Sequence, residues 1–411
     1  MAERPAFVVI GGGLAAAKAA ETLRAEGFEG RLVVVAEEPV PPYERPPLSK
    51  GYLQGGDAFA DARVHDEGFY DEHDIELITG ATAVAMDAGA RTVTLDSGRV
   101  LDYDRLLLAT GSVPRRPPIP GADLPEVHVL RTLADSDRLR DVIAQGGPLV
   151  LVGAGWIGCE IAASARQLGA QVTLVDQAQA PLEQVLGPEV GGHFAALHRA
   201  HGVELRLGSG VARIEGGAGV ERVVLADGTS LEAAAVLLGV GVAPDTRLAE
   251  LGALRVDDGI VVDEHLRSSA PDVFAAGDVA SAMHPRYGRH IRVEHWSVAL
   301  NQGTAAGRFM LDAGEPYDRL PYFFSDQYDT GMEYTGLHGP GDRLVVRGRL
   351  EDQAFQAFWL DDADRVSAGM HVNDWDAIEP IRRLIESGRP VNAAALADTQ
   401  TAVDVAEVAR A

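Results

Sequence analysis

Two segments of the sequence carry small residues in the pattern Gly-X-Gly-X-X-small, each between an apolar run and a helical pattern. They are "VVIGGGLAAAKAA", with Gly11, Gly13 and Ala16, and "VLVGAGWIGCEIAA", with Gly153, Gly155 and Gly158. The first glycine turns the chain, the second lets a pyrophosphate approach the backbone, and the third small residue lets helix and strand pack closely. One such turn is a weak signal, whereas two predict two dinucleotide sites. The plain alternative is a pair of such units that bind nothing.

An acidic residue ends the next apolar run after each turn, where it can accept hydrogen bonds from a ribose. Glu37 follows "LVVVA", and Asp176 ends "VTLVD". The residues after Asp176 are Gln177, Ala178 and Gln179, which offer no cation to a 2′-phosphate. The second turn is therefore predicted to bind NADH in preference to NADPH.

A longer pattern also occurs twice in the sequence. "DSGRVLDYDRLLLATGSVPR" closes the first unit and "ADGTSLEAAAVLLGVGVAPD" the second, which indicates a repeated domain. Their glycine-rich ends, with Thr110, Gly111 and Gly241, can lie against a nucleotide. A further strand ends at Asp278, at the edge where doubly wound sheets bind ligands, and this acid could bond the hydroxyls of a flavin. The alternative is that Asp278 is an aspartate of a backbone turn that binds no ligand.

The bulk composition limits the classes of function. A chain of 411 residues suggests two or three domains. The 36 basic and 61 acidic residues give a net charge of −25, which argues against nucleic acid and anionic membrane as partners. Cys159 is the only cysteine, and neither a cleavable signal nor a long apolar run is present. We expect a cytoplasmic protein without a metal site.

The order of these motifs resembles the flavoproteins with two dinucleotide-binding domains and a glutathione-reductase-type fold. Within that group, "PYERPPLSKGYL", "RVEHW" and "PYFFSDQYD" resemble the NADH-dependent ferredoxin reductases of bacterial cytochrome P450 and aromatic dioxygenase systems. The resemblance covers nearly the whole chain. It implies an α/β fold with two Rossmann-like domains, for FAD and NAD, and an α+β C-terminal domain.

The resemblance also implies two sets of binding residues. Those for FAD are Gly11, Gly13, Leu14, Ala15, Ala16, Glu37, Arg45, Lys50, Thr110, Gly111, Arg131, Asp278, Glu294 and Trp296. Those for NAD are Gly153, Gly155, Trp156, Ile157, Gly158, Glu160, Asp176 and Gly241.

The segment "PPYERPPLSK" (41–50) holds four prolines and two cations, so it cannot be ordinary helix. Prolines give a stiff wall for a flavin at low entropic cost, and Arg45 and Lys50 supply positive charge. The resemblance implies that Lys50 lies near the flavin N5 and pairs with Glu160, and that both are catalytic. The alternatives are a solvated loop lysine and a first-turn acid favoured by the helix dipole.

Three further positions take roles from the resemblance. Glu294 and Trp296 are expected along the flavin, at the start of a helix. Arg131 is expected between the two cofactors, although a plain surface arginine fits the sequence nearly as well. Phe324 stands where the family usually has tryptophan, so a ring is kept and the indole donor is lost.

The predicted layout is discontinuous. We place the FAD domain at 1–114 and 246–325, because Asp278 must return to the first sheet, and the NAD domain at 115–245. Residues 326–411 form a C-terminal interface domain, with short strand-like runs before the amphipathic helix "AIEPIRRLIESG".

The implied reaction is hydride transfer from NADH to FAD, followed by single-electron transfer to a small acidic [2Fe–2S] ferredoxin that docks weakly. One cysteine excludes the flavin reductases with active disulfides. The candidate docking cations are Arg286, Arg289, Arg292, Arg308, Arg343 and Arg347. We expect a monomer or weak homodimer. The alternatives are a reductase for rubredoxin or another carrier, and an NADH-sensing flavoprotein resembling apoptosis-inducing factor.

Overall fold

The computed structural model describes residues 4–409, and the chain folds into two compact units, each built from three stretches of sequence. The first unit contains the stretch that ends at Pro46, together with Ala58–Val113 and Val242–Arg319. The second contains Pro47–Asp57, Pro114–Gly241 and the stretch from Leu320 onward.

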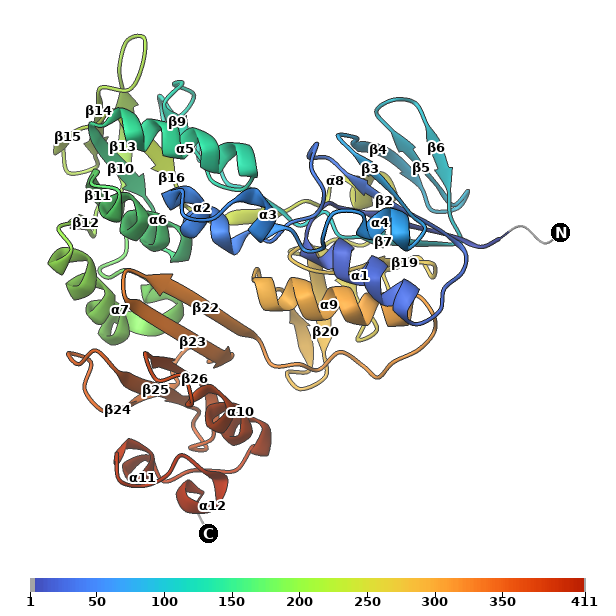
Figure 1. Ribbon diagram of the computed structural model, residues 1–411. Helices are drawn as coiled ribbons and strands as arrows, with labels where there is room; N and C mark the ends of the chain where they lie inside the picture. The colour runs from blue at the N-terminus through green and yellow to red at the C-terminus, as the bar shows by residue number, and fades with distance from the viewer. Residues whose placement is uncertain (1–3, 410–411) are drawn as a thin grey trace. The chain divides into compact units, whose positions relative to one another are not determined.

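The first unit is built on a parallel sheet of five strands in the order β19-β7-β1-β2-β3 (Figure 1). The strands are β1 (Ala6–Ile10), β2 (Arg31–Ala36), β3 (Ile75–Thr79), β7 (Arg105–Leu108) and β19 (Val273–Ala275). Most are continuous apolar runs rather than alternating ones, which is typical of parallel strands covered on both faces. Since all five run the same way, their carboxyl ends share one edge of the sheet.

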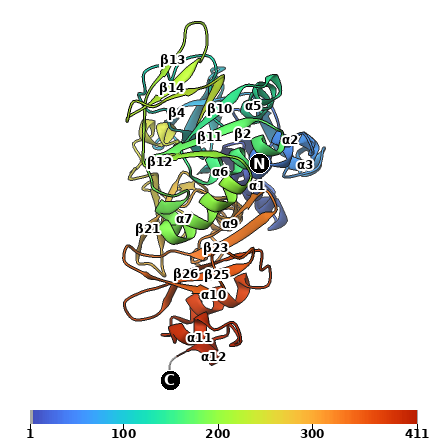
Figure 2. The same cartoon turned by 90° about the vertical axis from the view of Figure 1, so that its left-hand side faces the viewer.

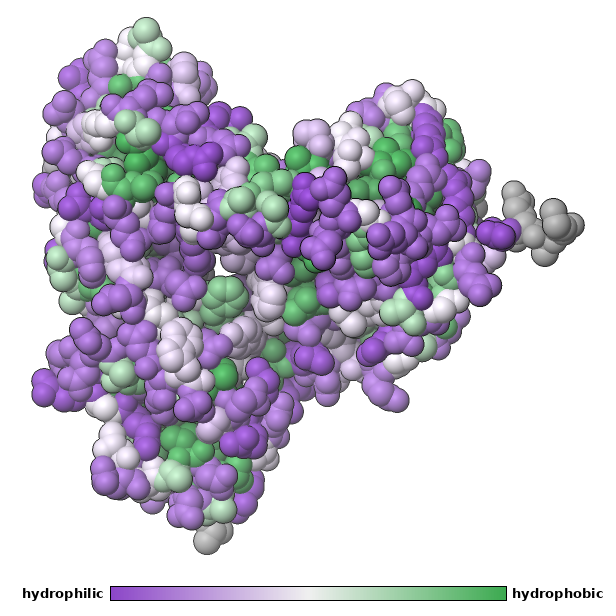
Figure 3. All heavy atoms as spheres, viewed as in Figure 1, coloured by the Kyte–Doolittle hydropathy of each residue, from purple (hydrophilic) through white to green (hydrophobic). Residues whose placement is uncertain are grey.

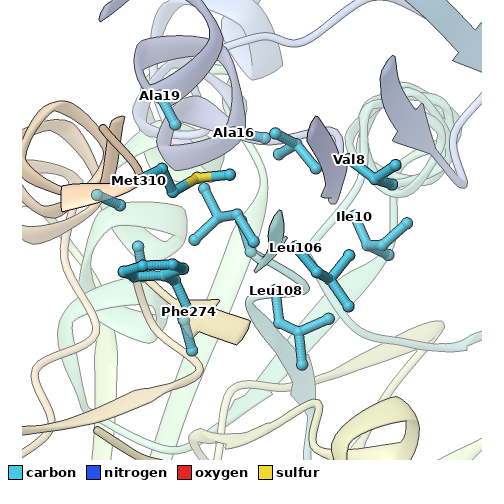
Figure 4. Packing of buried hydrophobic residues seen from close by; sticks show 14 of the residues in the cluster. Val8, Ile10, Ala16, Ala19, Leu106, Leu108, Phe274 and Met310 are labelled. Carbon is cyan, nitrogen blue, oxygen red and sulfur yellow. The ribbon is translucent and has the colours of Figure 1, made fainter. Parts of the chain in front are cut away.

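Two helices that are far apart in the sequence, α1 (Leu14–Ala25) and α9 (Trp296–Phe309), pack side by side in this unit (Figure 1). A Cβ atom at Gly303 would lie 2.5 Å from the carbonyl oxygen of Ala15, so only glycine permits this approach. The two helices and the sheet share one apolar core. Figure 4 labels part of it: Val8, Ile10, Ala16, Ala19, Leu106, Leu108, Phe274 and Met310.

Smaller elements complete the first unit. One antiparallel sheet contains β4 (Ala83–Asp87), β5 (Thr92–Leu95) and β6 (Val100–Asp102), and α8 (Arg247–Leu251) packs on β4. A mixed sheet contains β18 (Ile260–Val262), β20 (Ala280–His284) and β21 (Arg289–Ile291). The short helices are α3 (Phe59–Ala62) and α4 (Phe69–Glu72).

The second unit repeats the parallel design, as the duplicated sequence predicts. Its sheet has the order β12-β11-β10-β16-β9. The strands are β9 (Val127–His128), β10 (Pro148–Val152), β11 (Gln171–Asp176), β12 (Glu204–Leu207) and β16 (Ala235–Leu238). Its helices are α5 (Leu133–Gln145), α6 (Trp156–Gln167) and α7 (Glu183–Ala200), which kinks at Gly187.

A three-stranded antiparallel sheet again accompanies the parallel one. It is formed by β13 (Val211–Glu215), β14 (Arg222–Leu225) and β15 (Ser230–Glu232), as β4–β6 are in the first unit. The glycine-rich ends lead into two short strands that pair with each other, β8 (Ser112–Pro114) and β17 (Val242–Pro244).

The C-terminal part of the second unit is a five-stranded antiparallel sheet in the order β22-β23-β26-β25-β24. The strands are β22 (Tyr322–Gln327), β23 (Thr330–Gly336), β24 (Arg343–Arg347), β25 (Phe355–Leu360) and β26 (Val366–Val372). Figure 2 shows α10 (Ile378–Ser387), α11 (Ala393–Ala397) and α12 (Val405–Val408) gathered below this sheet, with α6 and α7 above it.

Alternate residues of β25 join different cores, which explains why the whole strand is buried. Phe358 and Leu360 pack with α10, α11 and α12, whereas Ala357 and Trp359 join the core of α6 and α7. The predicted amphipathic helix and the strand-like runs before it are therefore present. The predicted domain boundary between residues 325 and 326 falls inside β22, and the three-domain division stays a prediction.

The drawn face of each unit is mainly polar, with apolar side chains in small separate patches (Figure 3). Among residues 4–409, no helix combines the length and the apolar character needed to cross a bilayer.

Candidate functional site

The predicted site residues divide between the two units. Of the FAD set, all but Lys50 and Arg131 lie in the first unit, and the whole NAD set lies in the second. Each half-site is therefore described within its own unit.

The first glycine-rich turn joins β1 to α1. A Cβ atom at Gly11 would lie 2.1 Å from the carbonyl oxygen of Ala109, and its φ is +145°, so glycine is required there. Gly13 is the N-cap of α1, and a Cβ atom added there would meet nothing within 4 Å. The first intrahelical bond is donated by Ala17, so the amides of Leu14–Ala16 precede the helical ladder and form an anion-binding helix start.

The acids near this turn differ in their surroundings. Glu37 follows β2 and is exposed. Glu38 accepts hydrogen bonds from Tyr43 Oη at 2.6 Å and from Arg45 Nη2 at 3.1 Å. Arg45 thus shares its charge with a neighbouring carboxylate, while Glu37 projects from the strand end.

Asp278 follows β19, as its motif predicts, and it meets the glycine-rich end after β7. Its Oδ2 accepts a hydrogen bond from Ser112 Oγ at 2.9 Å. Thr110 Oγ1 donates to the carbonyl of Asp245 at 2.7 Å, and Gly111 has a φ of +71°. Ser112 was not predicted, although it lies beside the predicted pair in the sequence.

The start of α9 is held by local polar contacts. His295 is the N-cap, and its Nδ1 accepts a hydrogen bond from the Ser297 amide at 3.2 Å, so its role is structural. Glu294 is bonded to Arg292, which also pairs with Asp258 at 3.0 Å and is only 9% exposed. The prediction that Arg292 is a docking cation is therefore wrong, because two carboxylates and burial hold it inside the unit.

The second glycine-rich turn joins β10 to α6 with the same geometry. Gly155 is the N-cap and has open space in place of a Cβ atom, whereas a Cβ atom at Gly158 would lie 1.9 Å from the carbonyl oxygen of Gly153. Trp156 and Ile157 form the first turn, and Trp156 packs edge-on against Phe323 with the ring centroids 4.6 Å apart. This turn can accept a second pyrophosphate.

Asp176 ends β11 and contacts the glycine-rich turn. Its Oδ2 accepts from the Ala154 amide at 2.6 Å and its Oδ1 from the Ala178 amide at 2.8 Å. A carboxylate offers about four lone-pair positions, so ribose hydroxyls can still be accepted. Gly241 has a φ of +87° and open space, and the Arg131 amide donates to Asp135 at 3.1 Å, just before α5.

The structure brings Lys50 and Glu160 together, although 110 residues separate them in the sequence. Lys50 is the N-cap of α2 (Gly51–Gln54), which follows a 3₁₀ turn at Pro46–Ser49. Its Nζ lies 2.7 Å from Oε2 of Glu160, which is 5% exposed and belongs to α6. Phe324 lies under the ammonium group, with its centroid 5.8 Å from Nζ.

Two serines that the sequence analysis missed complete the surroundings of Glu160. Ser49 Oγ donates to Oε2 at 2.5 Å, and Ser325 Oγ donates to Oε1 at 2.8 Å. An ionised carboxylate is costly to bury unless it is paired and hydrogen-bonded, and both oxygens of Glu160 meet that condition. Ser49 lies beside Lys50, but nothing local in the sequence marks Ser325.

Cys159 lies next to Glu160 and is fully buried. Burial raises the pKa of its thiol, and the nearby charges of Glu160 and Asp176 act in the same direction. The group is therefore a neutral thiol and a small core residue.

The family comparisons agree with these features. Residues 5–303 match the family model described as "Pyridine nucleotide-disulphide oxidoreductase", and residues 322–406 match "Reductase C-terminal". The chain therefore belongs to the pyridine nucleotide-disulphide oxidoreductase family, whose members use FAD and NADH. The predicted fold class, enzyme class and cofactors are confirmed.

Individual relatives narrow the class to the ferredoxin reductases, as the motifs predict. The chain is 38% identical to the ferredoxin–NAD(+) reductase component of the anthranilate 1,2-dioxygenase system of Burkholderia cepacia, over 95% of this chain and 97% of that protein. It is 36% identical to putidaredoxin reductase of Pseudomonas putida, over 95% and 94%. It matches the crystal structure of a covalent putidaredoxin reductase–putidaredoxin complex with a TM-score of 0.93 and 36% identity, over 97% of both chains.

Both turns fit the cofactors of this family. Gly13 and Gly155 leave open space at helix starts whose first amides precede the intrahelical hydrogen bonds and are available to a pyrophosphate. Neither α1 nor α6 has an acidic residue in its first turn that would repel a phosphate.

Proposed function

We propose that this chain oxidises NADH and passes the electrons singly to a [2Fe–2S] ferredoxin that supplies a cytochrome P450 or a Rieske oxygenase. Bound FAD supplies the chemistry, because it accepts electrons in pairs and releases them one at a time. The observation that carries the proposal is the buried Lys50–Glu160 pair with its two serine donors. A fixed, charged cluster of this kind suits a redox site and is costly for mere packing.

In the proposed FAD site, the start of α1 binds the pyrophosphate and Glu37 accepts from the ribose. Asp278 accepts from hydroxyls of the flavin side chain, and Ser112 holds its carboxylate in place. Glu294 and Trp296 line the flavin at the start of α9, whose helix dipole favours negative charge there.

In the proposed NADH site, the start of α6 binds the pyrophosphate and Asp176 accepts from the adenosine ribose. A 2′-phosphate would meet the charge of Asp176 without any cation at residues 177–179. Lys50 then provides positive charge beside the flavin, and Glu160 sets the position of its ammonium group.

The proposed ferredoxin is acidic and docks weakly. Arg286 and Arg289 are exposed near the β20–β21 turn, and Arg308 is 51% exposed although it pairs with Glu26 at 3.0 Å. In the second unit, Arg343 pairs with Asp364, and Arg347 donates to backbone carbonyls of 396–399. The candidates that remain exposed are therefore Arg286, Arg289, Arg308 and Arg343, whereas Arg347 is partly buried.

The proposal includes a monomer or weak homodimer that works in the cytoplasm. The neutral, buried thiol of Cys159 suits a reducing compartment. Sedimentation of the FAD-loaded protein with and without NADH would measure the association state.

The test is anaerobic reduction of each two-iron ferredoxin of the host by NADH and the FAD-loaded protein, with ferricyanide as a control acceptor that needs no docking. Rapid reduction of one ferredoxin is the expected result. Turnover with ferricyanide and rubredoxin alone would favour another carrier. A long-lived charge-transfer band with NADH-driven dimerisation, and no carrier reduction, would favour an NADH sensor.

A further inference from the structure

A chain of buried hydrogen bonds runs from the β22–β23 turn to the carboxylate of Glu160. Tyr328 Oη lies 3.1 Å from His198 Nδ1, and His198 Nε2 lies 3.0 Å from Gln327 Oε1. Gln327 Nε2 donates to Ser325 Oγ at 3.3 Å, and Ser325 Oγ donates to Glu160 Oε1 at 2.8 Å. All of these contacts lie within the second unit. His198 and Ser325 are 0% exposed and Gln327 is 1% exposed.

Two elements place these side chains in line. Ser325 and Gln327 are two residues apart on β22, so they point to the same side of the strand. His198 belongs to α7, near its C-terminal end. Tyr328 has a φ of +60°, in the left-handed region that costs a bulky residue free energy. Its ring stacks on His201 with the centroids 3.6 Å apart, which holds the turn against α7.

The direction of every proton in this chain follows from Glu160. An ionised carboxylate only accepts, so the single proton of Ser325 must point to Oε1. Ser325 must then accept from the amide group of Gln327, whose carbonyl oxygen faces His198. That oxygen cannot donate, so Nε2 of His198 carries the proton and Nδ1 accepts from Tyr328. Burial lowers the pKa of His198 to about 4, which keeps the imidazole neutral as this arrangement requires.

The cost of burying these groups argues for a role beyond filling space. Apolar residues of similar size would pack without desolvating three polar side chains. The line of hydrogen bonds from Tyr328 ends on Oε1 of Glu160, which leaves Oε2 to Ser49 and Lys50. The carboxylate is thereby held at both oxygens.

We infer that His198, Gln327 and Ser325 are positioning residues, which fix the carboxylate of Glu160 and, through it, the ammonium group of Lys50 beside the flavin. This inference rests on the proposed function, because it assumes that Lys50 assists hydride transfer. None of the three needs to touch a cofactor for this effect.

The central experiment compares His198→Phe with His193→Phe in the FAD-loaded protein. His193 lies on the same helix, but it bonds the Leu350 carbonyl and is not part of the hydrogen bonds that lead to Glu160. We expect His198→Phe to slow flavin reduction at saturating NADH about tenfold, less than the roughly hundredfold cost of a 1 Å misplacement. The Kd for NADH should stay unchanged, and His193→Phe should match the wild type.

Three further measurements separate positioning from general damage. His198→Gln keeps a donor toward Gln327 and should restore most of the rate. In the Lys50→Met background, His198→Phe should have no further effect, because both changes act through the same ammonium group. The midpoint potential of the bound flavin should fall in Lys50→Met, fall less in His198→Phe, and fall no further in the double variant.

Ser325→Ala provides a second route if His198→Phe does not fold, since it removes one hydroxyl from the chain. It should slow flavin reduction as His198→Phe does. A wild-type rate and potential in Ser325→Ala, or equal effects of His198→Phe with and without Lys50, would overturn the inference while the proposed function stands. A wild-type rate and potential in Lys50→Met would instead overturn the proposed role of Lys50.

Discussion

Replacing Lys50 by methionine tests the central ion pair most directly. Methionine keeps an unbranched apolar stem but removes the cation that lies 2.7 Å from Glu160 Oε2. Removing one partner of a buried pair costs about 3–5 kcal/mol, because the other charge stays buried. Lys50 is 19% exposed and the two serine donors remain, so we expect a lower cost of about 2–3 kcal/mol.

A double-mutant cycle measures the pair itself. Glu160→Gln alone should cost less, because the partly exposed ammonium group can turn to water. The double variant should lose about 2 kcal/mol less unfolding free energy than the two single variants lose together. Urea unfolding at a fixed FAD concentration measures these differences, since bound FAD shifts the apparent stability.

The chain offers a matched control, because its only other lysine is Lys18. Lys18 pairs with Glu21 three residues away. The two lysines are similarly exposed, but Glu21 is 37% exposed whereas Glu160 is 5% exposed. Lys18→Met should therefore cost no more than about 0.5 kcal/mol. Additive losses in the cycle, or equal losses in the two lysine variants, would refute the reasoning from burial.

The remaining predictions concern the cofactors, acid stability and docking. NADH should exceed NADPH in kcat/KM by at least about tenfold, because Asp176 repels a 2′-phosphate; equal values would contradict this. FAD should be released on denaturation, and Asp278→Ala should weaken its binding by about 1.5–3 kcal/mol, measured by titration of the apoprotein. The pKa of His198 is lowered to about 4, so between about pH 6.5 and pH 4 the imidazole takes up a proton only in the unfolded chain. The free energy of unfolding should therefore fall by about 3 kcal/mol over this range. His198→Gln should lack this acid loss in urea unfolding. High salt should slow ferredoxin reduction far more than ferricyanide reduction, and charge reversal at Arg289 or Arg308 should raise only the KM for ferredoxin. No salt dependence, with both reversals tolerated, would place docking elsewhere.

The glycine-rich turns could be predicted because their causes are local. Gly11 and Gly158 are required by close approach of backbone to backbone within one strand–turn–helix unit, and the sequence carries that requirement at a fixed spacing. Asp176 and Asp278 could be placed for a similar reason, since one ends and the other closely follows a strand that is recognisable from its apolar run. The Lys50–Glu160 pair came from the family resemblance, since no local rule links these positions.

The electrostatic partners needed the tertiary structure. Arg292 looks like a surface cation in "HPRYGRHIR", yet Glu294 and Asp258 hold it in a buried position. Arg308 keeps its exposure and nevertheless pairs with Glu26, 282 residues away. A sequence gives the charge of a side chain, while its exposure and its partners depend on how distant segments pack.

The sequence by itself therefore determined the two dinucleotide-binding turns, the acids that follow them and the family, because steric and hydrogen-bonding needs within about 30 residues shape those motifs. Only the tertiary structure decided that Ser49 and Ser325 donate to Glu160, and that Gln327 and His198 extend this line of hydrogen bonds. A buried carboxylate must find donors wherever the fold supplies them. Here they come from the 3₁₀ turn before α2 and from β22, while α7 supplies the histidine that bonds Gln327. Their positions in the chain carry no common spacing, so packing alone brings them into one hydrogen-bonded site.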